Sequence, residues 1–277
     1  MEVKNVKIYV SVDFEGLGGI TQWSDVVHGV RYKQNILIEQ LESFLDAVGE
    51  NYVLVSDSHA MGDNILWDIT RKYDNVEIIS GNFRKNYMMT GLDETFDRVV
   101  FFGYHAGIGT RYAVMDHTYS SSSIFNVWIN GKLMNEALIN AAYAGIFNVP
   151  VAMIVGDDKL KGQVKLKNLF YVETKTSLGR FSAKHRSMKK VINDIKETTK
   201  KMLEIPKEEF EIFKFDTPVE LVVELSDTAR ADLIEMIPLV ERFDGRKVRV
   251  VHEDYKVIFD AILSIAYMAS IVKYIGR

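Results

Sequence analysis

Short apolar runs alternate with longer amphipathic stretches through most of the chain. The short runs predict seven buried strands, at Val6–Val12, Tyr52–Val55, Val76–Ile79, Val99–Gly103, Ile124–Ile129, Pro150–Val155 and Leu169–Glu173. The longer stretches predict four helices, at Tyr32–Val48, Leu133–Phe147, Asp158–Val164 and Ala183–Leu203. Strands that alternate with helices are typical of βαβ units. The pattern therefore predicts an α/β fold, in which three α/β/α layers surround a largely parallel, possibly mixed, sheet.

The alternation of apolar runs and amphipathic stretches is interrupted between Pro206 and Pro218, where charged residues cluster. Two further strands are predicted at Val219–Leu225 and Lys247–Val251, with a helix starting after Ser226 and a final helix at Tyr255–Tyr274. We therefore predict a catalytic α/β domain over residues 1–205 and a small α+β subdomain over residues 206–277. The long stretch Ala106–Ser123, rich in Gly and Ser, contains no predicted element, which is typical of a functional or mobile loop.

Composition narrows the chemistry. The 277 residues include no cysteine, which excludes disulfides, Fe–S clusters and thiol catalysis, so any metal must be held by nitrogen and oxygen ligands. The net charge of −4 argues against nucleic acid or an anionic membrane as a partner. The first apolar run soon meets Asp13, unlike a signal peptide, and Ala261–Val272 is shorter than the ~20 residues of a membrane span. We expect a soluble, cytoplasmic protein.

Polar residues follow three of the predicted strands directly. Asp13 and Glu15 follow the first strand, His59 lies just after the second, and His105 lies just after the fourth. In a parallel sheet these ends share the carboxyl edge, where open α/β sheets bind ligands. Carboxylates and imidazoles together suit Zn²⁺ or a similar divalent metal. The coincidence of three such strand ends therefore indicates a metal site.

Each residue alone has a simpler explanation. Asp13 and Glu15 are typical of solvated strand ends, and an Asp-Ser-His segment such as that ending at His59 is typical of an Asx turn. A single His105 after an apolar strand is more often structural. Glu136, in the first turn of a predicted helix, is a favourable charge at a helix N-terminus.

His117 lies in the Gly- and Ser-rich loop. The common role of such a histidine is that of a surface residue. A loop histidine near a metal is also a natural general acid or base, because its pKa lies near working pH.

Several separated motifs, taken together, make the sequence resemble a known family. They are Ser11-Val12-Asp13-Phe14-Glu15-Gly16, Ser56-Asp57-Ser58-His59, Gly103-Tyr104-His105-Ala106, Val114-Met115-Asp116-His117, Asn135-Glu136-Ala137-Leu138-Ile139-Asn140, and Val149-Pro150-Val151 with Gly156-Asp157-Asp158. Their order and spacing resemble the dizinc D-aminopeptidases first recognised with a bacterial dipeptide-transport operon. The resemblance covers roughly Lys7 to Phe181 and weakens toward the C-terminus.

The resemblance implies a set of site residues, a cofactor and an assembly. The implied metal ligands are Asp13, Glu15, His59, His105 and Glu136, and the implied catalytic residue is His117. The implied cofactor is a pair of divalent metal ions, expected to be Zn²⁺. The implied partners are a short peptide substrate and further copies of the chain in a decameric ring. The chain departs from the family at Asp116, where the family sequence has Ser, and in the loop Gly107–Ala113.

The number of ligands is physically reasonable. Five side chains give two metals three protein ligands each only if one carboxylate bridges, and we expect Asp13 to do so. Three ligands per metal leave a position for water, which two metals together can activate. Asp57 and Asn140 are candidates for supporting or substrate contacts, and Asn140 lies one helical turn from Glu136.

The favoured hypothesis is a metallo-aminopeptidase that removes an N-terminal residue, of D configuration by resemblance, from short peptides or amides through water activated by two zinc ions. His117 would then act as acid and base, stabilise the oxyanion or serve as nucleophile. One alternative is a dimetal phosphatase or nucleotidase, because strand-end Asp and His ligands also serve phosphoryl chemistry. The segment Gly16–Gly19, however, lacks the spacing of a phosphate-binding glycine motif. The other alternative is a non-enzymatic, metal-stabilised protein that forms rings.

Overall fold

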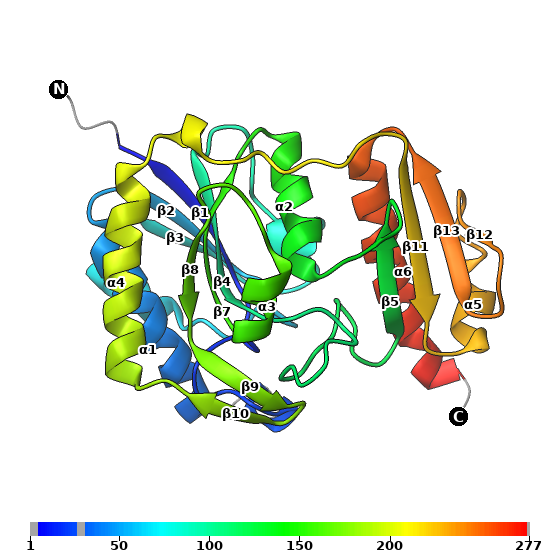
Figure 1. Ribbon diagram of the computed structural model, residues 1–277, viewed down its shortest axis with the longest axis horizontal. Coiled ribbons are helices and arrows are strands. Elements are labelled where there is room, and N and C mark those ends of the chain that lie inside the picture. The colour runs from blue at the N-terminus through cyan, green and yellow to red at the C-terminus, as the bar shows by residue number, and fades with distance from the viewer. Residues whose placement is uncertain (1–4, 27–30, 276–277) are drawn as a thin grey trace.

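A six-stranded parallel sheet forms the larger part of the molecule. The computed structural model describes residues 5–26 and 31–275. The sheet has the order β3-β2-β1-β4-β7-β8, and every neighbouring pair is parallel (Figure 1). Its strands are β1 (Lys7–Val12), β2 (Tyr52–Asp57), β3 (Val76–Ile79), β4 (Arg98–Tyr104), β7 (Val151–Gly156) and β8 (Phe170–Glu173). The predicted largely parallel sheet is therefore confirmed.

Helices cover both faces of this sheet. On one face, α1 (Arg31–Val48) and α4 (Met188–Glu204) bury apolar stripes that include Leu41 and Ile195, in one core with Val10 of β1. On the other face, α2 (Glu136–Ile146) packs its Ala- and Ile-rich side against β4. A short helix, α3 (Asp158–Gln163), follows β7. Burial on both faces explains why the strands are almost continuously apolar.

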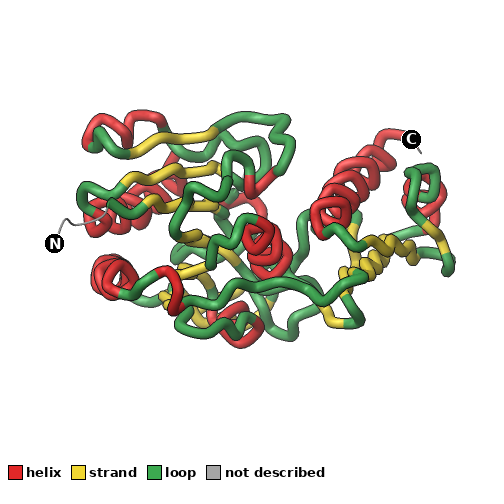
Figure 2. The backbone as a smooth tube through the Cα atoms, turned by 90° about the horizontal axis from the view of Figure 1, so that it is seen from above, coloured by secondary structure: helices red, strands yellow, loops and turns green. Residues whose placement is uncertain are grey.

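A second, antiparallel sheet lies beside the first (Figure 2). Its order is β12-β13-β11-β5-β6, formed by β12 (Glu241–Arg242), β13 (Lys247–His252), β11 (Val219–Leu225), β5 (Ile124–Ile129) and β6 (Lys132–Leu133). The strand at Ile124–Ile129 thus forms where it is predicted, but it pairs with β11 and not with the parallel sheet. The second sheet therefore draws on chain from both sides of residue 205, and the predicted domain boundary there stays a prediction.

The helix α6 (Tyr255–Ile275) packs between α2 and the antiparallel sheet, with α5 (Thr228–Ile234) at its side. By length and composition alone, the helical segment Tyr255–Tyr274 could cross a membrane. This segment is longer than the apolar stretch Ala261–Val272 on which the sequence-based expectation rested. In the structure one face of α6, including Ile258, is buried against α2 and β11. We therefore assign α6 to the core, while the cytoplasmic location and the absence of a membrane partner stay predictions.

Two boundaries differ from the sequence-based expectation. The predicted helix Ala183–Leu203 begins only at Met188, because Ser182–His185 forms β10 in a hairpin with β9 (Lys175–Gly179). The helix α2 begins at Glu136 because the side chain of Asn135 accepts a hydrogen bond from the backbone N–H of Leu138 and caps it. Short 3₁₀ turns occur at Trp23–Asp25, Trp67–Lys72, Tyr87–Met89 and Lys207–Glu209.

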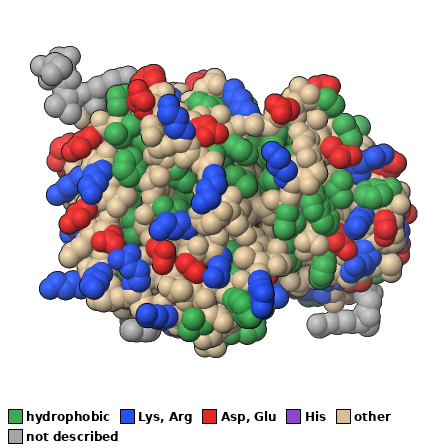
Figure 3. Space-filling model, in the orientation of Figure 1, with side chains coloured by type: hydrophobic (Ala, Val, Ile, Leu, Met, Phe, Trp, Pro, Cys, Tyr) green, Lys and Arg blue, Asp and Glu red, His purple; other side chains and the backbone are tan. Residues whose placement is uncertain are grey.

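The surface carries both signs of charge. On the face drawn in Figure 3, basic and acidic side chains are interspersed over both parts of the molecule. This mixture agrees with the small net charge of −4.

Two glycines allow the ends of β1 and β4 to approach each other closely. The N–H of Gly16 donates to the carbonyl of Gly103 at 2.7 Å. A Cβ on Gly16 would lie 1.8 Å from the backbone oxygen of Tyr104, and one on Gly103 would lie 2.1 Å from the backbone oxygen of Asp13. No other residue type fits at these positions, so the two segments that carry Asp13 and His105 can meet only through glycine.

We predict that Gly16→Ala destabilises the protein by about 2–4 kcal/mol, because the added methyl group meets backbone atoms that cannot move aside. The matched control is Gly162→Ala in α3, where a Cβ meets nothing within 4 Å. That change should leave stability unchanged or raise it by up to ~1 kcal/mol. Thermal denaturation of both variants checks this, and equal melting temperatures would contradict the close approach.

Candidate metal centre

The candidate ligands gather at the carboxyl edge of the parallel sheet. Asp13 follows β1 directly, His59 lies two residues beyond β2, and His105 follows β4 directly. Glu136 is the first residue of α2, and its carboxylate lies beside His105. All of these side chains are buried. The structure therefore brings together residues that are remote in sequence, as the strand-end pattern predicts.

Asp13 and Glu15 converge on one side of the cluster. Nδ1 of His59 lies 3.3 Å from Oδ1 of Asp13 and 3.2 Å from Oε2 of Glu15. Their segment is a turn, closed by the hydrogen bond from the N–H of Leu17 to the carbonyl of Phe14 at 3.1 Å. The expected convergence of the carboxylates is thus present, although the backbone is not extended there.

His105 and Glu136 occupy the other side. Nε2 of His105 lies 3.4 Å from Oδ2 of Asp13 and 3.7 Å from Oε2 of Glu136. Nδ1 of His105 is 2.9 Å from the carbonyl of Ala106, which can only accept a hydrogen bond, so Nδ1 carries the proton. Nε2 therefore presents its lone pair to the two carboxylates. The two oxygens of Asp13 thus face different sets of neighbours.

Several buried atoms in the cluster have no hydrogen-bond partner among the described residues. They include Oδ2 of Asp13, Oε2 of Glu15 and Nε2 of His105. Leaving such atoms unpaired is costly in a protein interior. One ligand atom each from Asp13, Glu15 and His105 lie within 4.8 Å of one another, as do those of His105, His117 and Glu136. This donor set of oxygen and imidazole nitrogen fits divalent cations such as zinc.

The pKa shifts within the cluster show the electrostatic cost of burying several carboxylates close together. Burial, together with the charge of Glu15, raises the pKa of Asp13 to about 6. Burial, and then the charge of Asp13, raises the pKa of Glu136 well above its usual range. Burial also opposes ionisation of Glu15, but the positive charge of His59 overcomes it and brings the pKa of Glu15 well below its usual range. A positive charge at this site would therefore stabilise the ionised carboxylates.

His117 lies against the same cluster. Its ring stacks on His105 with centroids 4.3 Å apart, and Nε2 is 3.8 Å from Oε1 of Glu136. Nδ1 donates to the carbonyl of Met115 at 2.8 Å, which leaves Nε2 as the unprotonated nitrogen. Burial, and then the neighbouring His105, lowers the pKa of His117 to about 4, so the ring is neutral at neutral pH.

Asp57 and Asn140 support the site indirectly. The carboxylate of Asp57 accepts the backbone N–H groups of Asn64 and Ile65, at 2.6 and 2.8 Å, and so fixes the loop beyond His59. Asn140 accepts the hydroxyl of Tyr119 at 2.8 Å. The backbone N–H of Tyr119 in turn donates to Oε1 of Glu136 at 2.6 Å. These residues orient the candidate ligands.

Sequence reasoning missed the residues that hold the loops in place. Lys175, at the start of β9, is fully buried, and its ammonium donates to the carbonyls of Glu15, Leu17 and Ile20. Asp157, the N-cap of α3, accepts the N–H of Ala106 beside His105 at 3.1 Å. A strand followed by Gly-Asp-Asp at a helix start was the available signal for Asp157, whereas nothing local marks Lys175.

The tip of the hairpin β9–β10 holds the loop of His117. The carbonyl of Arg180 accepts the N–H of Met115 at 2.8 Å, and its guanidinium donates to the carbonyl of Asp116 at 3.3 Å. The carboxylate of Asp116 also accepts the N–H of Gly109 at 2.8 Å. Asp116, where the resembled family has Ser, therefore ties two stretches of its own loop to the hairpin.

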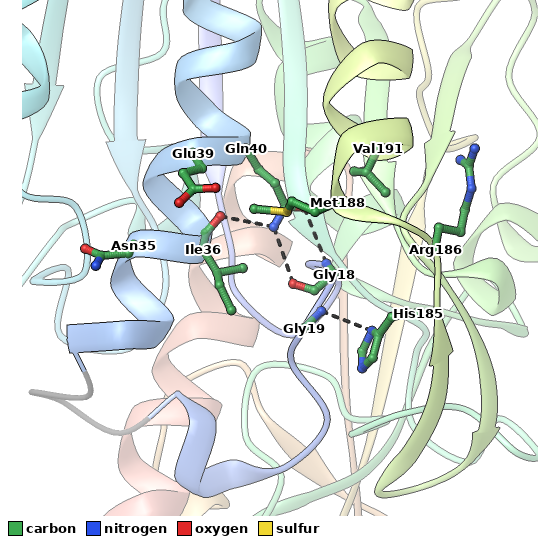
Figure 4. Close-up of a pocket in the computed structure, with 10 residues that line it drawn as sticks. All are labelled: Gly18, Gly19, Asn35, Ile36, Glu39, Gln40, His185, Arg186, Met188 and Val191. Carbon is green, nitrogen blue, oxygen red and sulfur yellow. Dashed lines mark hydrogen bonds between the residues drawn. The ribbon is translucent and has the colours of Figure 1, made fainter.

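A pocket separate from this cluster is drawn in Figure 4. It has a volume of about 370 Å³ and lies between α1, β10 and the start of α4. None of the six candidate site residues lines it, and the N–H groups of its two glycines are already paired, that of Gly18 with Oε1 of Gln40 at 3.4 Å and that of Gly19 with Nδ1 of His185 at 3.0 Å. The chemistry therefore belongs to the buried cluster.

Comparisons with known proteins agree with this geometry. The chain is 30% identical over 247 residues to a curated D-aminopeptidase of Bacillus subtilis (strain 168), covering 85% of this chain and 87% of that protein. The solved structure of the Zn-dependent D-aminopeptidase DppA from Bacillus subtilis, a self-compartmentalizing protease, matches with a TM-score of 0.89 and 27% identity over 96% of this chain and 98% of that one. The model of the Peptidase M55 family, D-aminopeptidase, matches residues 6–264. The chain therefore belongs to the M55 family of D-aminopeptidases.

Proposed function

We propose that this protein is a zinc-dependent aminopeptidase that hydrolyses the N-terminal D-residue from short peptides or amides. The observation that carries the proposal is the buried cluster of unpartnered carboxylate and imidazole atoms at the sheet edge, in a chain of the D-aminopeptidase family. A buried set of like charges is stable only when protons or cations neutralise it. The cluster therefore supports a resident metal cofactor.

We further propose that Asp13, Glu15, His59, His105 and Glu136 hold two zinc ions. Asp13 is suited to bridge them, because its Oδ1 faces His59 at 3.3 Å while its Oδ2 faces His105 at 3.4 Å. Two bound zinc ions would activate a water molecule and polarise the scissile carbonyl. The fixed tautomer of His105 suits this role, since its Nε2 has no other partner among the described residues.

His117 is suited to move a proton during hydrolysis. Its Nδ1–H is engaged by the carbonyl of Met115, so Nε2 is the atom that can accept a proton and later donate it to the leaving amine. The rings of Trp23 and His105 pack on it and fix its orientation, with centroids 5.2 and 4.3 Å away. We therefore assign acid and base catalysis to His117, in preference to a nucleophilic role.

The central test is an assay of the purified protein on D- and L-aminoacyl amides, before and after chelation. We expect hydrolysis of the D-amides, loss of activity with the metal, and recovery when Zn²⁺ is restored. Elemental analysis should find two zinc ions per chain. Hydrolysis of p-nitrophenyl phosphate but of no amide would favour the phosphatase alternative, and full metal occupancy without any hydrolysis would refute an enzymatic role.

Two substitutions separate the catalyst from the ligands. His117→Ala should lower kcat by about 10²- to 10⁴-fold, because the proton transfer is lost, while bound zinc stays near the wild-type amount. Asp13→Ala should lower the bound zinc itself, since both proposed ions lose a ligand. Loss of zinc in His117→Ala would instead make His117 a ligand, in line with its closeness to His105 and Glu136.

We also propose that the protein assembles into a ring of ten copies that encloses the active sites. The related Bacillus subtilis structure is a self-compartmentalizing protease. Large apolar side chains of this chain are more than half exposed, among them Trp67 and Phe83 near the sheet edge and Met236 and Leu239 in the smaller part. Exposed apolar groups of this kind are typical of protein interfaces.

Light scattering during size-exclusion chromatography should therefore give the mass of ten chains of 31.7 kDa. Trp67→Glu should reduce this mass, because a charge in an apolar interface is costly. A monomer at all concentrations would contradict the assembly but would leave the metal site unaffected.

A further inference from the structure

A small cavity lies between α6 and the segment that follows His117. Its volume is about 150 Å³. One wall belongs to the loops of the larger part of the molecule and the other to α6, and the lining residues are Tyr87, Tyr119, Ser120, Leu263, Ala266, Tyr267 and Ser270. An apolar cavity of about this size is large enough to hold a benzene-sized molecule.

The cavity adjoins the candidate metal centre. Tyr119 lies two residues after His117, and its backbone N–H donates to Oε1 of Glu136 at 2.6 Å. The hydroxyl of Tyr119 is fixed by Oδ1 of Asn140 at 2.8 Å, so its ring is a fixed part of the cavity wall. Burial, and then the charges of Glu136 and Asp13, raises the pKa of Tyr87 well above its usual range, which agrees with a position beside the carboxylates.

The walls of the cavity favour an apolar occupant. The ring of Tyr87 lies 5.8 Å from that of Tyr119 and 5.9 Å from that of Tyr267, measured between centroids. Leu263 and Ala266 add aliphatic surface from α6. The hydroxyl of Tyr267 is buried and has no hydrogen-bond partner among the described residues, an arrangement that a bound peptide group could relieve.

We propose that this cavity receives the side chain of the substrate's N-terminal residue and selects apolar side chains of leucine size over alanine. This inference rests on the proposed aminopeptidase function, because it assumes that the substrate's first residue is held at the metal centre. Ala266 is the critical position, since it has the smallest side chain in the wall. A larger residue there should take up part of the cavity, and none of the candidate ligands lines it.

The experiment compares kcat/KM for D-leucine amide and D-alanine amide with the zinc-loaded protein. Ala266→Leu should lower the ratio of the two values, leucine over alanine, by about 10-fold or more, the usual effect of a few methylenes in a hydrophobic pocket. The matched control is Ala261→Leu, on the same helix but outside the cavity, which should keep the wild-type ratio. Melting temperature and mass by light scattering are recorded for both variants.

The outcomes separate this inference from the proposed function. If the wild-type protein hydrolyses neither amide, the proposed function fails. If it hydrolyses both and Ala266→Leu keeps the ratio, only the side-chain cavity is refuted. A reduced mass with an unchanged ratio would assign the cavity to an interface between copies, which also overturns the inference. If Ala266→Leu does not fold, Ala266→Val carries the same comparison with a smaller expected drop.

Discussion

The burial of carboxylates against one another is the constraint on which the structure depends. Asp13, Glu15 and Glu136 are almost fully enclosed, and oxygens of Asp13 and Glu15 lack hydrogen-bond partners among the described residues. Burial and mutual repulsion would drive such a group to take up protons or to separate, as the raised pKa of Asp13 and of Glu136 indicates. The fold prevents separation because Asp13 and Glu15 lie at the end of β1 and in the turn after it, while Glu136 begins α2. The buried carboxylates thereby keep a negative charge close together, which bound divalent cations would neutralise.

Several features around the cluster hold the carboxylates and the neighbouring histidines in place. Parallel strands bring His59 and His105 to the same edge as Asp13, and the glycines at positions 16 and 103 remove the side chains that would keep these segments apart. The buried ammonium of Lys175 then occupies three carbonyls of the turn that carries Glu15. The hairpin tip secures the loop of His117 through Arg180. The backbone turn that carries Glu15 and the loop that carries His117 are thus held by separate contacts, from Lys175 and from Arg180.

Much of this candidate site could be predicted from the sequence, because an apolar strand that ends in an acidic residue or a histidine is a local pattern. Parallel pairing of such strands then brings these residues to the same edge of the sheet. The family resemblance added Glu136 and His117, which local patterns favoured only as a helix-end charge and a surface histidine. Other features have no local signature. The sheet that Ile124–Ile129 joins depends on its pairing with β11, about a hundred residues away. Lys175 and Arg180 resemble ordinary surface charges, and their importance arises only from contacts with remote backbone.

The contact between Lys175 and the backbone of Glu15 spans 160 residues. All five candidate ligands precede Lys175 in the chain, so a ribosome has completed every one of them before it adds this lysine. Until β9 emerges, the turn after β1 lacks the ammonium that organises its carbonyls, and long-range contacts of this kind form late in folding. We therefore expect the donor atoms of Asp13 and Glu15 to reach their final geometry only after Lys175 has been added. Metal binding at the candidate ligands would then follow the folding of the α/β unit instead of guiding it.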